Sequence, residues 1–325
     1  MIQFYKKRDF GELISDTFTF FKENGKNYFK NYILINGLLL ILMVVIFVVG
    51  YRELFSQMFS SNSNGQNFYF QTYFQENQAM LILVGVAVFI LFLLSTIVSY
   101  SYPVLYMKRL SETGNPNIKA DELLSDIKNN TGRFLIFFLG MMFVVTPLAI
   151  VVFGISYLLV LIIIGVFLLL FLMPAFMNVV NFLLFDYFHT KKGFFESLSY
   201  AFRAQFSYPD GKEKSPFWKY WGSMMVTYMI INIVVSIFTM IPLFIIMIKI
   251  FTVLDENSSS AASQNPFEGG LGILFFVIYG FSLLASFILM NVIYVNSGLM
   301  YYDSRTDLHR KVDLTEIDSI GSREN

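Results

Sequence analysis

Six long apolar stretches alternate with polar segments along the 325 residues of the chain. A helix needs about 20 predominantly apolar residues to cross the hydrocarbon core of a bilayer. The pattern therefore predicts an all-α polytopic membrane protein whose six transmembrane helices form three hairpins. The predicted spans are Tyr32–Gly50, Ala79–Tyr102, Phe134–Phe153, Tyr157–Phe185, Phe217–Lys249 and Leu271–Met300.

The third and fourth spans form one apolar block of more than 50 residues. A single helix of that length is far too long for a membrane, so the block must fold back on itself. Gly154 and Ser156 are small, turn-favouring residues inside it, and we predict the turn between the two spans at this position.

Positive charge is distributed unevenly over the segments between the spans. Of the 23 Lys and Arg residues, 21 lie at the N-terminus, in two connecting segments or in the C-terminal tail, and only Arg52 and Lys249 lie elsewhere. Cytoplasmic flanks of membrane helices retain Lys and Arg. We therefore expect a multi-pass membrane protein with both termini in the cytoplasm. The expected parts are an amphipathic N-terminal segment (1–31), a six-span membrane domain (32–305) and a cytoplasmic tail (306–325).

The composition agrees with a membrane protein and excludes some chemistry. The chain is 56% hydrophobic with a mean hydropathy of +0.60, which is too apolar for a soluble domain of this length. It contains no cysteine, so thiol catalysis and thiolate metal sites are excluded. The formal net charge is zero, and no overall field attracts nucleic acid. The first apolar run lacks a small-residue cleavage pattern, so we expect a retained anchor.

A similar amphipathic element precedes each odd-numbered span. The first covers Asp9–Tyr32, with Asp9 and Glu12 at capping-box spacing and a break expected at Asn24-Gly25. A second, shorter copy begins at Asp121, and a third copy begins at Phe194. Because a helix with an apolar stripe and a charged face lies in the membrane interface, we predict three short cytoplasmic amphipathic helices. In the alternative interpretation, aromatic residues and Lys simply flank every membrane helix on its cytoplasmic side.

Three segments carry a resemblance to a known family. They are Phe10-Gly11-Glu12-Leu13-Ile14-Ser15-Asp16-Thr17-Phe18, then Phe195-Glu196-Ser197-Leu198-Ser199-Tyr200-Ala201-Phe202-Arg203 with Phe217-Trp218-Lys219, and Tyr301-Tyr302-Asp303-Ser304-Arg305. In them the chain resembles the six-span membrane domain associated with bacterial glycerophosphoryl diester phosphodiesterases and its stand-alone relatives. The resemblance implies the fold and a location in the bacterial inner (cytoplasmic) membrane. The first segment also resembles bacterial proteins grouped with MoxR-type AAA ATPases and von Willebrand A-domain membrane proteins, which implies such partners.

The enzymatic half of the family name does not carry over to this chain. The phosphodiesterase domain of that family is a separate barrel that needs His and carboxylate groups around a metal, and the chain has no room for it. Its two histidines, His189 and His309, lack metal-site spacing and are expected to be solvated surface residues. We expect no enzymatic activity, no cofactor and no metal. No charged residue lies near the centre of a predicted span, which counts against a proton-coupled transporter.

Amide side chains within the spans are the remaining polar feature. One interpretation is interhelical hydrogen bonding, worth about 0.6 kcal/mol per contact in membranes. The other is a polar groove open to the inner leaflet and suited to a lipid headgroup, with tyrosines and basic residues at its rim. The candidate groove residues are Asn36, Asn178, Asn181, Asn291, Asn296, Tyr102, Tyr106, Lys108 and Arg109.

These patterns leave two classes of function open. The leading hypothesis is a non-enzymatic scaffold or accessory subunit of a membrane complex, because catalytic groups and intramembrane charge are missing from the sequence patterns. The alternative is a protein that binds or transports membrane lipids or small amphiphiles, because the amide groups and the basic rim suit a polar headgroup.

Overall fold

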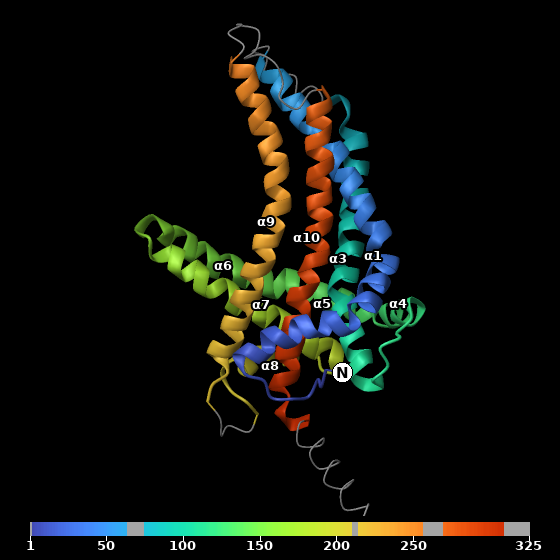
Figure 1. Cartoon of the computed structure of the whole chain (residues 1–325), viewed down its shortest axis with the longest axis vertical. Coiled ribbons are helices and arrows are strands. Elements are labelled where there is room, and N and C mark those ends of the chain that lie inside the picture. Colours follow the sequence, from blue (N-terminus) through green and yellow to red (C-terminus); the bar gives the residue numbers. More distant parts are fainter. Residues whose placement is uncertain (1, 64–74, 210–213, 256–268, 309–325) are drawn as a thin grey trace, which may run out of the picture. The chain divides into compact units, whose positions relative to one another are not determined.

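The computed structural model describes residues 2–63, 75–209, 214–255 and 269–308. Every regular element within these residues is helical (Figure 1). The elements are α1 (Phe10–Ser63), α3 (Gln78–Thr113), α4 (Ala120–Asn129), α5 (Thr131–Gly140), the π-helical turn η1 (Met141–Val145), α6 (Thr146–Leu158), the 3₁₀ turn η2 (Leu159–Ile162), α7 (Ile164–His189), α8 (Phe194–Phe206), α9 (Phe217–Asp255) and α10 (Gly269–Ser304).

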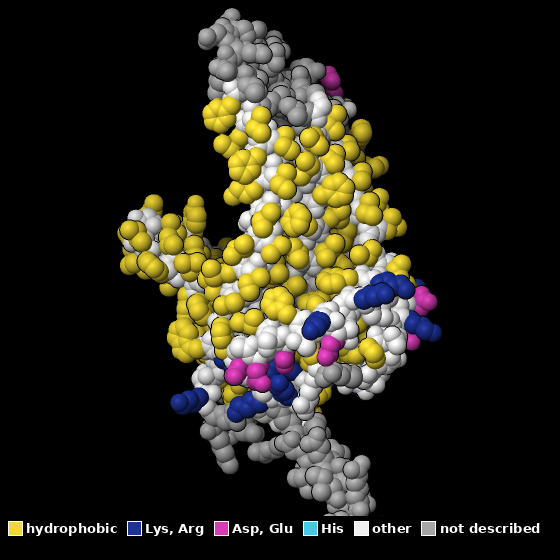
Figure 2. Space-filling view, in the orientation of Figure 1, with side chains coloured by type: hydrophobic (Ala, Val, Ile, Leu, Met, Phe, Trp, Pro, Cys, Tyr) yellow, Lys and Arg dark blue, Asp and Glu magenta, His cyan; other side chains and the backbone are white. Residues whose placement is uncertain are grey.

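Six of the described helical stretches are long and apolar enough to cross a membrane, and this confirms the predicted fold class. They are Phe10–Gly50, Gln78–Thr113, Thr131–Ile162, Ile164–His189, Phe217–Ile245 and Gly272–Ser304. Their outward side chains are apolar: Leu83, for example, is 70% exposed. Figure 2 shows hydrophobic side chains covering the helices over most of their length, as expected where lipid tails replace water.

The chain divides into two compact units that do not follow the three expected parts. Unit 1 comprises Met1–Ile35, Tyr100–Ile231 and Asn291–Asn325, and unit 2 comprises Asn36–Ser99 and Asn232–Met290. Each of α1, α3, α9 and α10 contributes residues to both units. The boundary expected between residues 31 and 32 lies inside α1, which is one uninterrupted helix.

The break expected at Asn24-Gly25 is therefore wrong. Asn24 Nδ2 donates to the carbonyl of Phe20, four residues back, which keeps its side chain on the helix. Gly25 costs an α-helix only about 1 kcal/mol relative to Ala, and the long helix absorbs that cost. The start of α1 does agree with the sequence: Asp9 N–H donates to Glu12 Oε2 at 2.9 Å, and Glu12 N–H donates to Asp9 Oδ1 at 2.7 Å.

The turn of the third and fourth spans lies later than Gly154 and Ser156, so that prediction is also wrong. Both residues are inside α6, where Ser156 Oγ donates to the carbonyl of Val152. The chain reverses through η2 and Ile163, whose φ is 66°, so the fourth span begins at Ile164 rather than at Tyr157. Gly165 permits this turn, because a Cβ there would lie 2.1 Å from the Ser156 carbonyl oxygen.

Unit 1 has an aromatic core built from α1 and α3. Tyr28 meets Tyr102 and Tyr106 edge to face, with ring centroids 5.0 and 4.8 Å away, and Phe20 lies 5.8 Å from Tyr28. All four rings are fully buried. Aromatic pairs of this geometry contribute about 0.5–1.5 kcal/mol beyond the area that they bury, so these rings fix the two helices against each other.

Unit 2 contains the remaining parts of the four long helices. Phe47 of α1 stacks on Tyr279 of α10 with ring centroids 5.6 Å apart. One turn away, Val44 and Val48 approach Gly280 so closely that a Cβ on this glycine would lie 2.8 Å from each. Small residues that let helix backbones approach are a common basis of helix association in membranes.

Candidate functional site

Most of the predicted amide residues hold helices together. Asn181 Nδ2 of α7 donates to Ser297 Oγ of α10 at 2.9 Å. Asn296 Nδ2 donates to Thr17 Oγ1 and to Ser223 Oγ, both at 3.0 Å, and thereby joins α1, α9 and α10. All five side chains are buried. These contacts are the interhelical hydrogen bonds of the first interpretation.

The other predicted polar residues of the spans follow the same rule, with one exception. Tyr28 OH donates to Asn291 Oδ1 at 2.8 Å, and Tyr102 OH donates to the Tyr28 carbonyl. In unit 2, Asn36 Nδ2 donates to Ser99 Oγ at 2.9 Å. The exception is Asn178, which is fully buried and whose two amide atoms make no hydrogen bond with any described residue.

The residues predicted to form the rim of the groove make hydrogen bonds and ion pairs with neighbouring residues. Tyr106 OH donates to Asn27 Oδ1 at 3.0 Å. Lys108 Nζ donates to the Phe188 carbonyl at 3.2 Å. Arg109 forms ion pairs with Asp126 at 2.9 Å and with Glu122 at 3.3 Å. These contacts favour the helix-packing interpretation for eight of the nine predicted residues, whereas the Asn178 amide forms no hydrogen bond with any described residue.

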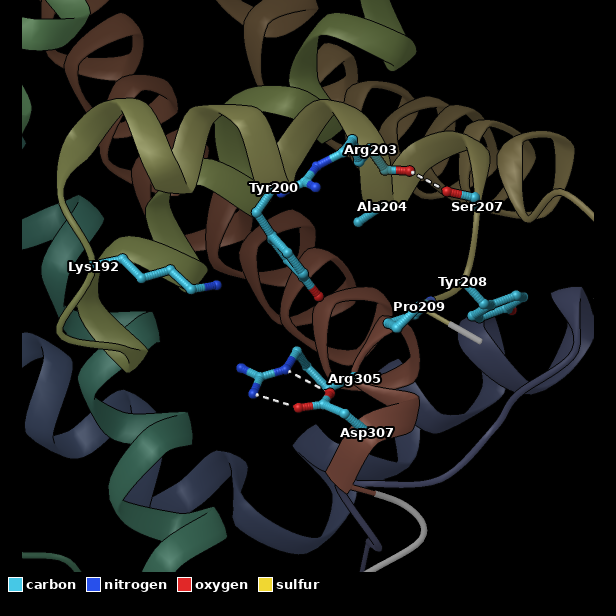
Figure 3. A pocket seen from close by; sticks show the side chains of 9 residues that line it. All are labelled: Lys192, Tyr200, Arg203, Ala204, Ser207, Tyr208, Pro209, Arg305 and Asp307. Atoms are coloured by element: carbon cyan, nitrogen blue, oxygen red, sulfur yellow. Dashed lines mark hydrogen bonds and ion pairs between the residues drawn. The ribbon is translucent and has the colours of Figure 1, made fainter. Parts of the chain in front are cut away.

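A different set of basic residues surrounds an open cleft in unit 1 (Figure 3). Its volume is about 470 Å³. Helix α8 supplies one wall, because residues three, four and seven positions after Tyr200 share a face of the helix. We call it the basic cleft, and its lining residues are Lys192, Tyr200, Arg203, Ala204, Ser207, Tyr208, Pro209, Arg305 and Asp307.

Local structure places α8 at this wall. Gly193 precedes the helix, and its N–H donates to Glu196 Oε2 at 3.3 Å, so a carboxylate covers the first turn. Lys192 lies in the short turn before the helix and Arg305 directly follows α10. Residues distant in the sequence therefore bring three cations to one cavity.

The cations of the basic cleft are only partly matched by carboxylates. Arg305 forms a two-pronged ion pair with Asp307, with N–O distances of 3.0 and 3.1 Å. Lys192 Nζ lies 3.4 Å from the fully buried carboxylate of Asp186. Arg203 forms no ion pair with any described residue, and its Nε donates only to the Ser199 carbonyl at 3.4 Å. The lining residues thus carry more positive than negative charge.

The protonation states of the cleft are fixed by burial and by this ion pair. Burial alone raises the pKa of Asp307, but the hydrogen bond and the charge of Arg305 outweigh it and hold that pKa below its ordinary value. The same pair raises the pKa of Arg305 against the opposing effect of burial. Burial raises the pKa of Tyr200, whose hydroxyl lies 2.7 Å from Ser304 Oγ. At neutral pH the cleft therefore presents the charged Arg305 and Asp307 pair beside the neutral hydroxyl of Tyr200.

A second charged group lies close to the cleft but is fully enclosed. Asp303, which is 0% exposed, accepts hydrogen bonds from Lys219 Nζ at 2.7 Å, from Tyr220 OH at 2.5 Å and from Tyr208 OH at 3.2 Å. It also accepts the backbone N–H of Arg8 at 2.5 Å. We call these residues the Asp303 cluster; it ties the N-terminal segment to α9 and α10.

His189 is not the solvated residue that the sequence indicates. Its Nε2 lies 3.1 Å from Tyr5 OH, and its ring meets those of Tyr301 and Tyr302 at 5.7 and 5.5 Å. The position at the end of α7 accounts for this, because the N-terminal segment crosses it. His309 lies outside the described residues. No group of three or more His, Asp or Glu side chains with metal-site geometry occurs in the part of the chain that the structure describes.

The face of α8 that points away from the basic cleft is aromatic. Phe195 and Phe206 are 68% and 57% exposed, and Trp218 at the start of α9 is 67% exposed. Phe206 stacks on Phe217 with ring centroids 5.2 Å apart. Exposed aromatic side chains of this kind gather at the boundary between lipid and water, and an interfacial helix has one such face and one charged face.

Comparison with known proteins gives no match: no protein-family model, no curated protein and no solved structure matches the chain. The function must therefore be argued from the cleft and its surroundings. The sequence marked Lys192, Arg203 and Arg305 only as members of basic segments. Their juxtaposition depends on the tertiary fold, and the nearest signals were the two resemblance segments that contain Arg203 and Arg305.

Proposed function

We propose that the protein is a non-enzymatic, six-span membrane protein that binds the anionic headgroup of a membrane phospholipid in the basic cleft. The observation that carries the proposal is the charge of Arg203, which forms no ion pair with any described residue and faces the same cavity as Lys192 and Arg305. A guanidinium group recognises phosphate oxygens with paired hydrogen bonds. Phosphate is the group that anionic membrane lipids present at this depth.

The orientation of α8 supports a headgroup rather than a soluble anion. Phe195 and Phe206 on its aromatic face favour the lipid boundary, while Tyr200 and Arg203 line the cleft on the opposite face. The cleft is thereby expected at the level of the headgroups. Its volume of about 470 Å³ lies within the range of about 300–1,000 Å³ found for small-molecule sites.

The test is retention of lipid by the purified protein. Native mass spectrometry in mild detergent should show phosphatidylglycerol retained in preference to phosphatidylcholine. Each basic residue near anionic lipid contributes about 1 kcal/mol, so Lys192→Gln with Arg203→Gln should weaken phosphatidylglycerol retention about 30-fold.

The matched control is Lys191→Gln with Lys214→Gln, which removes the same charge from exposed residues outside the cleft. It should leave retention close to that of the unaltered protein. Equal loss in the two double variants, or equal retention of the two lipids, would overturn the proposal.

The proposal extends to location and partners. The distribution of Lys and Arg supports a bacterial inner-membrane protein with cytoplasmic termini, and reporter fusions near residues 65, 115, 205 and 260 test this topology. A lipid-binding subunit can also be an accessory subunit of a membrane complex, with an AAA ATPase as the partner that the sequence resemblance implies. Purification in mild detergent without any reproducible partner would count against that extension.

A further inference from the structure

A second cavity of unit 1 differs from the basic cleft in its chemistry. It lies between α6, α7 and α8, has a volume of about 230 Å³, and is lined by apolar side chains with one exception. The exception is Gln205 of α8. This apolar pocket is smaller than the range of about 300–1,000 Å³ that holds drug-sized ligands, so a bulky ligand does not fit inside it.

The Gln205 amide is the unexplained group of this pocket. The side chain is 2% exposed, and its Nε2 has no hydrogen-bond partner in the described part of the chain. A buried donor without a partner costs free energy, so its presence beside an apolar cavity calls for an acceptor. Water does not fit well, because a buried water needs two to four polar partners and every other lining side chain is apolar.

We infer that the apolar pocket holds the part of one acyl chain nearest the ester group of a membrane ester lipid, with the ester carbonyl accepting a hydrogen bond from Gln205 Nε2. The hydrocarbon fits the walls formed by Val145, Val152 and Val179. A neutral carbonyl fits the amide, whereas the carboxylate of a free fatty acid would enter a pocket whose lining has no cation.

This site is independent of the basic cleft. Leu198, Phe202 and Gln205 line the apolar pocket, whereas Tyr200 and Arg203 line the cleft. These positions lie on opposite faces of α8 because successive residues are about 100° apart on a helix. One lipid molecule does not reach both cavities through the helix, so the acyl chain belongs to a second molecule.

The probe is a phosphatidylcholine with a photoreactive group in its acyl chain, added to the full-length protein in mild detergent. Its headgroup is zwitterionic, so the basic cleft does not favour it. We expect about one retained probe per protein, cross-linked to peptides of α6, α7 and α8. Cross-links spread evenly over all lipid-facing helices would show bulk lipid contact only and would overturn the inference.

Two variants on α6 test occupancy. Ala149→Phe places a ring in the pocket and should lower probe retention at least about tenfold. Val151→Phe adds the same ring to a residue that is 58% exposed and does not line the pocket, and retention should stay unchanged. Equal retention in the two variants contradicts the inference.

An ether-linked probe tests the carbonyl contact in the unaltered protein, so this arm does not depend on the folding of a variant. Losing one hydrogen bond should weaken its retention about fivefold relative to the ester probe. Gln205→Leu should bind both probes equally, at the ether level. Equal retention of ester and ether by the unaltered protein excludes the Gln205 contact, and displacement by free fatty acid excludes an ester lipid. The double variant Lys192→Gln with Arg203→Gln should not change the retention of either probe. A negative result at the apolar pocket is therefore distinguishable from a negative result at the basic cleft.

Discussion

The Asp303 cluster and the basic cleft use similar residues in opposite ways, although Tyr208 belongs to both. In the cluster, Lys219 meets a carboxylate that is 0% exposed and that accepts hydrogen bonds from tyrosine hydroxyls and a backbone amide. In the cleft, Arg203 meets no carboxylate of the described chain, and the cavity is open. A buried charge needs a matched partner, whereas an unmatched charge at an open cavity is available to a ligand.

The largest expected effect is that of removing the charge inside the cluster. Asp303→Asn leaves the Lys219 ammonium, whose side chain is only 17% exposed, without its carboxylate. Breaking a fully buried pair from one side costs about 3–5 kcal/mol, and we expect a loss near the lower end of that range. Thermal unfolding in detergent measures the loss. Asp307→Asn is the matched control: its carboxylate is 49% exposed, and exposed pairs contribute about 0.2–1 kcal/mol. Similar losses of thermal stability in the two variants would contradict the distinction between a buried, matched charge in the cluster and an exposed charge in the cleft.

The next effect concerns the guanidinium that fixes the N-terminal segment. The side chain of Arg8 is buried, pairs with Asp16 at 2.9 Å and donates to the carbonyls of Phe4 and Lys6. Lys cannot reproduce this fork of donors, so Arg8→Lys should cost about 2 kcal/mol. Lys7→Arg, at an exposed neighbour, is the control and should change stability little. Unfolding followed by denaturant or heat decides between these outcomes.

Tyr208 tests whether the two regions are coupled. Its hydroxyl accepts from Lys219 Nζ at 2.6 Å and donates to Asp303 Oδ2 at 3.2 Å. Figure 3 shows the side chain extending away from Arg305. Tyr208→Phe should therefore lower the free energy of unfolding by about 1–2 kcal/mol and leave phosphatidylglycerol retention unchanged. A loss of retention without a loss of stability would place this hydroxyl in the cleft instead.

The sequence predicted the helices better than it predicted their ends or the cleft. Apolar length is sufficient for a span because a bilayer accepts only backbones that satisfy their own hydrogen bonds. The same requirement keeps Gly25 and Gly154 helical. Glycines that mark helix ends in soluble proteins therefore led to wrong predicted helix boundaries here. The cleft could not be foreseen, because Lys192, Arg203 and Arg305 are joined by tertiary packing and share no spacing in the sequence.

The smallest effect on stability comes from the ion pair at the edge of the cleft, which should also affect binding. The pKa of Asp307 is lowered in the folded protein, because the hydrogen bond and charge of Arg305 outweigh its burial. A lowered carboxyl pKa stabilises the fold above the unfolded value of about 3.9, and this contribution is lost as the pH falls through the folded value. Because the carboxylate is half exposed, the stability change should be small.

Protonation of Asp307 also releases Arg305 to the cleft. At neutral pH, Asp307→Asn should therefore strengthen phosphatidylglycerol retention about fivefold, which corresponds to one additional unmatched charge at about 1 kcal/mol. In the unaltered protein, retention should therefore rise as the pH falls through the pKa of Asp307, and this rise should be absent in the variant. Weaker retention in Asp307→Asn would mean that Asp307 orders Arg305 for the ligand rather than competing with it, and the cleft would then resemble the Asp303 cluster in needing its own carboxylate.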